Sequence, residues 1–289
     1  MKTYKKTSSI YFVWLAIFVI VPLLMIIYYA FQDGDGQLSL AQFQRFFSSS
    51  SLITLFKSVR IAGIATILCL LLAYPVAYIM SRMKTRFQPT AMMLVVIPMW
   101  MNFLLRTYSW ITILSRNGIL NQFLESIGLS KMDMLYTEGA VILGMVYNFL
   151  PFMILPIYTA LEKMDQSLIE AAADLGANKV QTFTKVIFPL SLPGVASGIS
   201  MVFIPALSTF EITMLWGGNK TNLIGNIIEQ QFRVTGNWSY GSAMAVILMV
   251  FPVISLIISK DEDAQVARPT KAEKLVESVD QAMGGADNV

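Results

Sequence analysis

Six long apolar stretches, separated by shorter polar segments, dominate the pattern of this 289-residue chain. Each is close to or above the roughly 20 helical residues that cross the hydrocarbon core of a bilayer. None alternates apolar and polar positions as a β-barrel strand does, and a helix satisfies its own backbone in lipid. The predicted fold class is therefore an all-α integral membrane protein with six spans, at residues 10–31, 58–80, 90–114, 139–160, 195–216 and 240–259.

The positions of Lys and Arg predict the orientation of these spans, because short segments rich in these residues stay on the cytoplasmic side. Basic residues gather before the first span, in the turn at 82–88, in the segment 162–192 and after the last span. We therefore expect a cytoplasmic N-terminal tail (1–9), a membrane domain (10–259) and a cytoplasmic C-terminal tail (260–289). The C-terminal tail is polar and is expected to be mostly disordered.

Composition excludes several kinds of chemistry. Hydrophobic residues make up 55% of the chain and charged residues 13%, about half the usual charged share of a soluble domain. Histidine is absent and Cys69 is the only cysteine, so His-based catalysis, most transition-metal sites and disulfides are not expected. The net charge of +3 is too weak to indicate nucleic-acid binding. We expect membrane lipid as a partner, no cofactor, no metal and no enzymatic activity of the chain itself.

The segment 162–192 is too long and too patterned for a plain connection between two spans. Asp165 or Ser167 can begin a helix, and Ser167 with Glu170 three residues later fits a capping box. Gly176 lies where a glycine commonly ends a helix.

A second helix is expected over residues 179–188 of this segment, ended by Pro189 and Pro193. The pattern thus predicts a helix–glycine–helix hairpin on the cytoplasmic surface. A membrane-surface hairpin without any partner is the alternative.

The residues of this hairpin follow a known motif. Glu170, Ala171 and Ala172 are followed after three residues by Gly176 and, after nine more, by the sequence Val-Ile-Phe-Pro that ends at Pro189. This spacing resembles the EAA loop of binding-protein-dependent ABC importer permeases, usually written EAA-x3-G-x9-I-x-L-P. Val and Phe replace the Ile and Leu of that pattern.

The resemblance implies a type I permease fold in which the loop is a coupling helix that docks on a cytoplasmic ATPase. In this picture Glu170 makes polar docking contacts, Ala171 and Ala172 allow close packing, and Gly176 makes the turn. ATP would be bound by the partner, since the chain has no GxxxxGK[ST] phosphate loop.

Further segments narrow the resemblance. Residues 73–77 (AYPVA), 97–100 (IPMW), 106–108 (RTY), 150–156 (LPFMILP) and 217–226 are similar to the spermidine/putrescine (Pot-type) permeases, in particular their B subunits. That family implies a bacterial plasma-membrane assembly of two different permease subunits, two ATPase subunits and an external substrate-binding protein.

Five residues are candidates for a pathway through the membrane, because a polyamine needs carboxylates, acceptors or aromatic faces in place of water. Glu211 is the only acid well inside a predicted span, and Trp100, Arg106, Tyr147 and Asn148 fall at similar depth by the helical rise. Glu211 could contact a cationic substrate or act in gating, pair with Arg106, or lie on the outer rim. Trp100 and Tyr147 could provide cation–π contacts or a gate. Asn148 could line the pathway or repair a kinked backbone.

Three other functions remain open at this stage. The nearest is the same kind of importer for another solute, such as an iron complex, thiamine or a phosphonate. A secondary transporter would need no ATPase, and the EAA-like loop argues against it. An intramembrane enzyme would need paired acids, a Ser/Lys dyad or metal ligands within the spans, and a single glutamate makes this remote.

Overall fold

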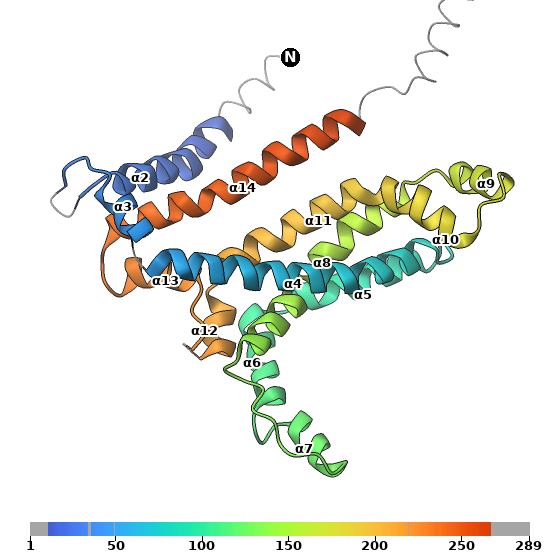
Figure 1. Ribbon diagram of the computed structural model, residues 1–289, viewed down its shortest axis with the longest axis horizontal. Coiled ribbons are helices and arrows are strands. Elements are labelled where there is room, and N and C mark those ends of the chain that lie inside the picture. Colours follow the sequence, from blue (N-terminus) through green and yellow to red (C-terminus); the bar gives the residue numbers. More distant parts are fainter. Residues whose placement is uncertain (1–10, 34–35, 49, 219, 267–289) are drawn as a thin grey trace, which may run out of the picture.

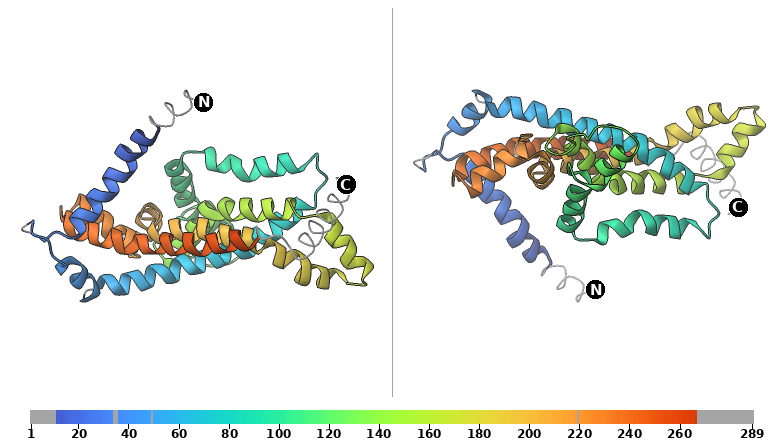
Figure 2. Two further views of the ribbon diagram at one scale, coloured as in Figure 1. Left: turned by 90° about the horizontal axis from the view of Figure 1, so that it is seen from above. Right: turned by 90° about the horizontal axis from the view of Figure 1, so that it is seen from below.

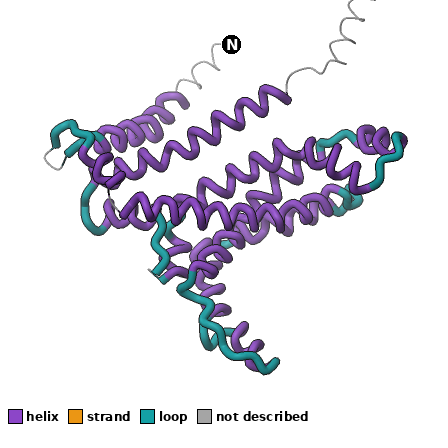
Figure 3. Tube along the Cα trace, in the orientation of Figure 1, coloured by secondary structure: helices purple, strands orange, loops and turns teal. Residues whose placement is uncertain are grey.

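The structure is a computed structural model that describes residues 11–33, 36–48, 50–218 and 220–266, and it is helical. Within those residues the only strand-like pairing is an isolated bridge between Gln32 and Leu38 (Figure 3). The helices in chain order are η1 (Ala16–Ile20), α2 (Val21–Ala30), α3 (Ala41–Ser48), α4 (Ser50–Ser81), α5 (Gln88–Trp100), α6 (Phe103–Leu114), α7 (Ile119–Ser126), α8 (Glu138–Glu162), α9 (Gln166–Asp174), α10 (Lys179–Thr182), η2 (Phe183–Ile187), α11 (Phe188–Ser208), α12 (Glu211–Gly217), α13 (Ile224–Arg233) and α14 (Trp238–Val266).

Three helices form the centre of the molecule: α4, α8 and α11 pack along one another (Figure 1). The face of α4 toward this bundle consists of small side chains that are fully buried. They are Ala62, Ala65, Cys69, Ala73 and Ala77. Small residues let helix backbones approach closely, which is the usual way in which helices associate within lipid. Larger side chains of α8 and α11, among them Met153 and Val202, fill the space between the helices.

The remaining helices lie around this centre. α14 packs on α11 and α13, and α2 lies along α14 (Figure 1). Apart from Ala30, no residue of the apolar helix Tyr11–Ala30 is buried within the chain, so its surface is suited to lipid or to another subunit. α6 and α7 project from the bundle, and α9 and α10 form a hairpin at the end of the molecule toward which α2 and α14 also extend (Figure 1).

Four described helices are long and apolar enough to cross a membrane alone. They are Tyr11–Ala30, Ser50–Ser81, Glu138–Glu162 and Lys179–Ser208. The predicted spans at 58–80 and 139–160 lie within the second and third of these. The apolar part of α14, Trp238–Ile254, is shorter, so the sixth span remains a prediction. α14 continues to Val266, past the predicted end at 259, whereas residues 1–9 and 267–289 of the predicted tails lie outside the described residues.

The prediction of one straight helix over 90–114 is wrong. α5 and the following segment are bent by 90° at Met101 and Asn102, so together they are a broken span or a re-entrant segment. Met101 is extended, and the Asn102 side chain accepts hydrogen bonds from the backbone N–H groups of Leu104 (2.9 Å) and Leu105 (3.2 Å). Asn102 therefore begins a new helix, as N-cap residues do. Figure 2 shows α5 alongside the bundle with α6 turned across its end.

The predicted span at 195–216 is also wrong in both its limits. The helix begins at Lys179 and runs without interruption to Ser208, where Thr209 takes an extended conformation and ends it. Pro189 and Pro193 do not stop it. A π-helical turn, η2, directly precedes this point, and in it the Phe188 N–H donates to the Phe183 carbonyl five residues back, so the hydrogen-bond register changes just before Pro189.

Candidate functional site

The hairpin of α9 and α10 begins as one of the two sequence-based alternatives predicts. Asp165 is the N-cap of α9, and its Oδ1 accepts a hydrogen bond from the backbone N–H of Ser167 at 2.9 Å. This hydrogen bond to the charged form holds the pKa of Asp165 below its usual value. The described residues show no Ser167–Glu170 capping box, because Asp165 satisfies the first turn instead.

Gly176 ends α9 in a Schellman motif. Its φ is +79°, in the left-handed region. The Ala177 N–H donates to the carbonyl of Ala172 (3.0 Å), and the Gly176 N–H donates to the carbonyl of Ala173 (2.9 Å). Asn178 then begins α10, and its side chain and that of Gln181 cap each other's backbone N–H at 2.9 Å. Two helix ends are thus satisfied within a few residues, which gives the turn a defined shape.

The motif residues lie on the surface of the hairpin. Glu170, Ala171 and Gly176 are exposed, and Ala172 is half-buried. Leu175 and Val180, on the two sides of the turn, are 89% and 70% exposed. Exposed apolar side chains beside small residues are typical of a docking surface. Pro189 is exposed as well, but it lies in the first turn of α11, away from the tip.

An aromatic cluster joins the hairpin to the central bundle. The ring of Phe183, in the π-helical turn, packs edge-on against Tyr74 (5.8 Å between centroids) and Tyr78 (5.7 Å) of α4. The hydroxyl oxygens of Tyr74 and Ser191, which is on α11, lie 2.9 Å apart in a hydrogen bond. The cluster therefore connects the base of the hairpin to α4 by both packing and hydrogen bonding.

Within the membrane domain, Arg106 joins the α5–α6 bend to α8. It is 9% exposed; its Nη1 donates to the Pro98 carbonyl (2.7 Å) and its Nη2 to Oδ1 of Asn148 (2.6 Å). The guanidinium also lies over the ring of Tyr147, at 5.4 Å from its centroid. Three of the five candidate pathway residues are thus brought together, and Arg106 provides the cation for the Tyr147 ring.

Glu211 and Trp100 lie outside this cluster. Glu211 is half-buried and is the first residue of α12, directly after the break, so it is not inside a continuous span. No described residue forms an ion pair or hydrogen bond with its carboxylate, and the alternative of an Arg106–Glu211 ion pair is not formed. Trp100, at the end of α5, is 76% exposed.

Glu211 lines a recess that lies beside the two helix breaks. The recess, of about 340 Å³, is lined by Phe103 at the start of α6, Phe149 of α8, and Phe210 and Glu211 at the start of α12, together with the end of α11. Asn226 of α13 holds this break in place. Its Nδ2 donates to the Phe210 carbonyl at 3.2 Å, and its Oδ1 accepts from Thr213 at 2.5 Å.

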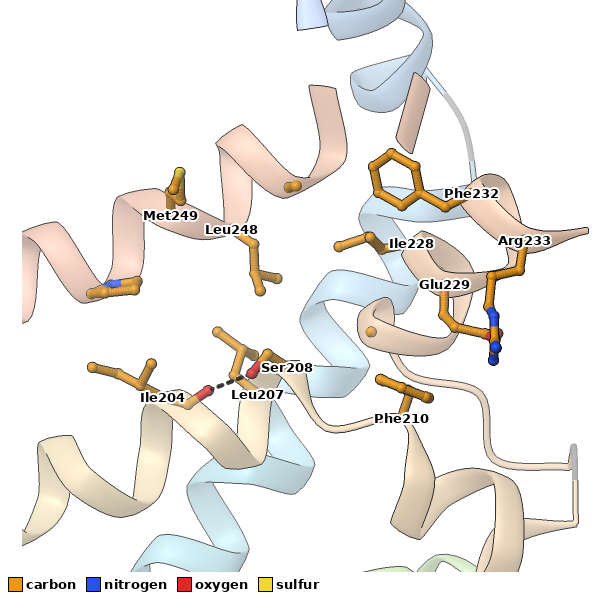
Figure 4. Close-up of a pocket in the computed structure, with 13 residues that line it drawn as sticks. Ile204, Leu207, Ser208, Phe210, Ile228, Glu229, Phe232, Arg233, Leu248 and Met249 are labelled. Atoms are coloured by element: carbon orange, nitrogen blue, oxygen red, sulfur yellow. Dashed lines mark hydrogen bonds and ion pairs between the residues drawn. The ribbon is translucent and has the colours of Figure 1, made fainter. Parts of the chain in front are cut away.

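Another cavity lies on the other side of Phe210, between α11, α13 and α14 (Figure 4). It measures about 490 Å³ and is lined mainly by apolar side chains such as Leu207, Ile228 and Met249. Its few polar groups are already engaged: the Ser208 hydroxyl donates to the Ile204 carbonyl, and Glu229 pairs with Arg233 at 3.3 Å. This cavity offers no free charge to a polar solute.

The family is decided by a comparison with known proteins. Residues 73–260 match the model of the family described as binding-protein-dependent transport system inner membrane component. The chain belongs to this family. The match covers the end of α4, all of α8 and α11, the hairpin and both helix breaks of this membrane permease.

Named relatives and solved structures agree with this assignment. The permease is 40% identical to the spermidine/putrescine transport system permease protein PotB of Haemophilus influenzae, over 89% of this chain and 93% of that one. It is 38% identical to the PotB protein of Escherichia coli K12, over 85% and 92%. Its fold is similar to a chain of a bacterial alginate ABC transporter (TM-score 0.76, 16% identity, 92% and 95% covered) and to the MetNI methionine ABC transporter (TM-score 0.54, 16% identity, 75% and 96% covered).

The sequence did not indicate the partners of Glu211 in the recess. Phe103, Phe149 and Phe210 come from three segments. Each lies in an apolar stretch, where a phenylalanine is expected and gives no sign of a binding site. One local signal was available: Asn102 and Thr209 are polar residues within long apolar runs, each shortly after a proline. Such positions favour helix ends over continuous helix, so they could have located both breaks.

Proposed function

We propose that this permease is a membrane-spanning subunit of an ATP-driven bacterial importer for polyamines such as spermidine and putrescine. The observation that carries the proposal is the 37–40% identity to polyamine permeases over almost their full length. A likeness of this extent favours the same class of solute over an iron complex, thiamine or a phosphonate. The uncompensated carboxylate of Glu211 supports it further, because it suits a cationic solute better than an anionic one.

The proposed assembly has a second, different permease subunit, two cytoplasmic ATPase subunits and an external substrate-binding protein. We propose six spans with both termini cytoplasmic, so that the α9–α10 hairpin lies on the side of the ATPases. The predominantly basic turn at 82–88 supports this orientation. The ATPases bind and hydrolyse ATP, and the chain itself catalyses no reaction.

In the proposed coupling step, the ATPases bind the exposed side of the hairpin. Glu170 makes polar contacts, Ala171 and Ala172 allow close approach, Gly176 sets the turn, and Pro189 marks the start of the membrane part of the helix. When the ATPases close, the hairpin moves, and the aromatic cluster around Phe183 transmits the movement to α4. The bundle then exchanges between inward-open and outward-open states.

In the proposed pathway, Arg106, Tyr147 and Asn148 have a positioning role, because they hold the α5–α6 bend against α8. Glu211 faces the solute. Trp100, exposed at the same bend, contacts the second permease subunit or the solute. A buried arginine beside a pathway for cations would repel the solute if its charge were free. The Arg106 guanidinium is instead bound by a carbonyl, an amide and an aromatic face.

The test is uptake of radiolabelled spermidine by proteoliposomes that contain the complete transporter, with binding protein outside and ATP inside. Uptake that requires both, and that vanadate inhibits, is the expected result. Transport without ATP, driven by a proton gradient, would show a secondary transporter instead. Uptake of only a non-amine solute delivered by the cognate binding protein would refute the polyamine assignment.

A further inference from the structure

Two interrupted helices meet at one place in this chain. The α5–α6 break at Met101 and Asn102 and the α11–α12 break at Thr209 both border the recess lined by Phe103, Phe149 and Phe210. By the helical rise, Phe149 lies about 20 Å from the cytoplasmic end of α8. Irregular backbone at membrane depth is tolerated where it is buried in protein or lines a water-filled cavity. The recess therefore qualifies as part of an aqueous pathway.

The recess combines one negative charge with aromatic walls. The Glu211 carboxylate is half-buried, and among the described residues it has neither an ion pair nor a hydrogen bond. The half-buried acids Glu138 and Glu229, in contrast, each form an ion pair with a basic residue of this chain. Arg106, the cation that the sequence offered as a partner for Glu211, is bound by Pro98 and Asn148 instead. A partly desolvated carboxylate without a partner is stabilised by a cation that comes from outside the chain.

The aromatic walls suit the same kind of ligand. Phenylalanine faces attract ammonium groups and also pack against methylene carbons. A linear polyamine carries ammonium groups separated by short methylene segments. One ammonium group would bind at Glu211, and the adjacent methylene segment would lie between Phe103, Phe149 and Phe210.

We propose that the Glu211 recess is an ammonium-binding site of the translocation pathway, in which the carboxylate binds one amine of a polyamine and the three phenylalanines enclose the adjoining methylenes. This inference rests on the proposed function and assigns this part of the pathway to particular residues. The break at Thr209 allows the site to open and close, because α12 is held to α13 by Asn226 and is separated from the continuous helix Lys179–Ser208.

The test compares Glu211→Gln with wild type in the complete reconstituted transporter. Because a hydrogen bond to a charged group is lost, we expect kcat/KM for spermidine uptake to fall about tenfold to a hundredfold. Phe149→Leu, which removes an aromatic face and keeps an apolar side chain, should lower it about two- to tenfold. The matched control is Glu229→Gln, which removes an acid that is paired with Arg233 and lines the other cavity, and uptake should be unaffected.

A thiol-protection experiment distinguishes contact from folding effects. The native cysteine, Cys69, is buried and does not react with a small cationic methanethiosulfonate reagent. Phe103→Cys places a reactive thiol in the recess of this chain. Spermidine should slow labelling more than sodium chloride of equal ionic strength, and addition of Glu211→Gln should abolish this protection. If Glu211→Gln does not assemble, Glu211→Asp replaces it in both assays and should raise KM and weaken protection.

The outcomes separate the site from the proposed function. The site is refuted if wild type takes up spermidine and Glu211→Gln does so with the same kcat/KM, or if spermidine still protects the thiol in Glu211→Gln. Either result leaves the assignment as a polyamine importer unaffected. Failure of wild type to take up any polyamine overturns the proposed function, and the site with it.

Discussion

Substitution of Gly176 by alanine tests the coupling hairpin at a position where the structure isolates a single physical effect. The φ of Gly176 is +79°, and a Cβ added there would meet nothing within 4 Å. The substitution therefore causes no collision. Its cost is the left-handed conformation itself, about 1–2 kcal/mol for an L-residue. Since 1.4 kcal/mol corresponds to a factor of ten, the population of the native turn falls about five- to thirtyfold relative to the alternatives.

Gly128 provides a matched control in the same chain. It ends α7 with φ +83°, also with nothing within 4 Å of an added Cβ, and its hydrogen bonds have the Schellman pattern of Gly176. Gly128→Ala thus has the same local cost in a segment that projects from another part of the molecule (Figure 1). Gly176→Asn is the rescue variant, because asparagine tolerates the left-handed region better than alanine does.

The assay is retention of the ATPase subunits on the purified permease complex, followed by spermidine uptake. Gly176→Ala should lose most of the bound ATPase and of the uptake, Gly176→Asn should retain a larger part of both, and Gly128→Ala should retain the ATPase fully. ATPase retention equal to wild type in Gly176→Ala, with uptake unchanged, would refute the assignment of this turn to docking. Equal loss in Gly128→Ala would show a general folding defect.

Three further substitutions test other contacts. Tyr74→Phe removes the hydrogen bond to Ser191 and keeps the ring, so the amount of spermidine taken up per ATP hydrolysed should fall. The amount of complex in the membrane should be unchanged. The same uptake per ATP as in wild type would contradict the role of the aromatic cluster. Arg106→Lys keeps the charge but cannot span both of its acceptors, so the melting temperature of the detergent-purified complex should fall, by an amount that corresponds to about 1–3 kcal/mol. Gly144→Val places its Cβ 2.7 Å from the buried Trp216 ring and should destabilise the complex by about 1–3 kcal/mol; an unchanged melting temperature would show that α12 is free to move away.

The sequence predicted the features that depend on local pattern. The spans at 58–80 and 139–160, the start of α9 at Asp165 and its end at Gly176 follow from apolar length and from capping chemistry. These signals act over a few residues, so one chain is enough to read them. The prediction for Asp165 left Ser167 as an alternative, and the hydrogen bond to Ser167 N–H decides between them.

The helix breaks and the partners of the polar residues could not be read in the same way. Pro189 was expected to end a helix, yet the π-helical turn before it changes the hydrogen-bond register and the helix continues. Pro205, in contrast, lies inside α11, which ends three residues later at Ser208. A proline in the sequence therefore does not by itself locate a helix end. The helical rise predicted that Arg106 and Glu211 lie at a similar depth in the membrane. Depth does not determine the direction of a side chain, and Arg106 points toward Asn148 of α8.

The unbroken helix from Lys179 to Ser208 has a mechanical consequence for the proposed importer. Its 30 residues make a rod of about 45 Å, with one end in the hairpin and the other at the Glu211 recess. A tilt of only about 10° about the hairpin end would displace the far end by about 8 Å, more than the width of an alkylammonium chain. No loop interrupts the helix between its two ends, and the places where it can bend are the π-helical turn η2 and its prolines. Closure of the ATPases and reshaping of the recess would therefore occur together. ATP hydrolysis would then always be accompanied by a change at the solute site.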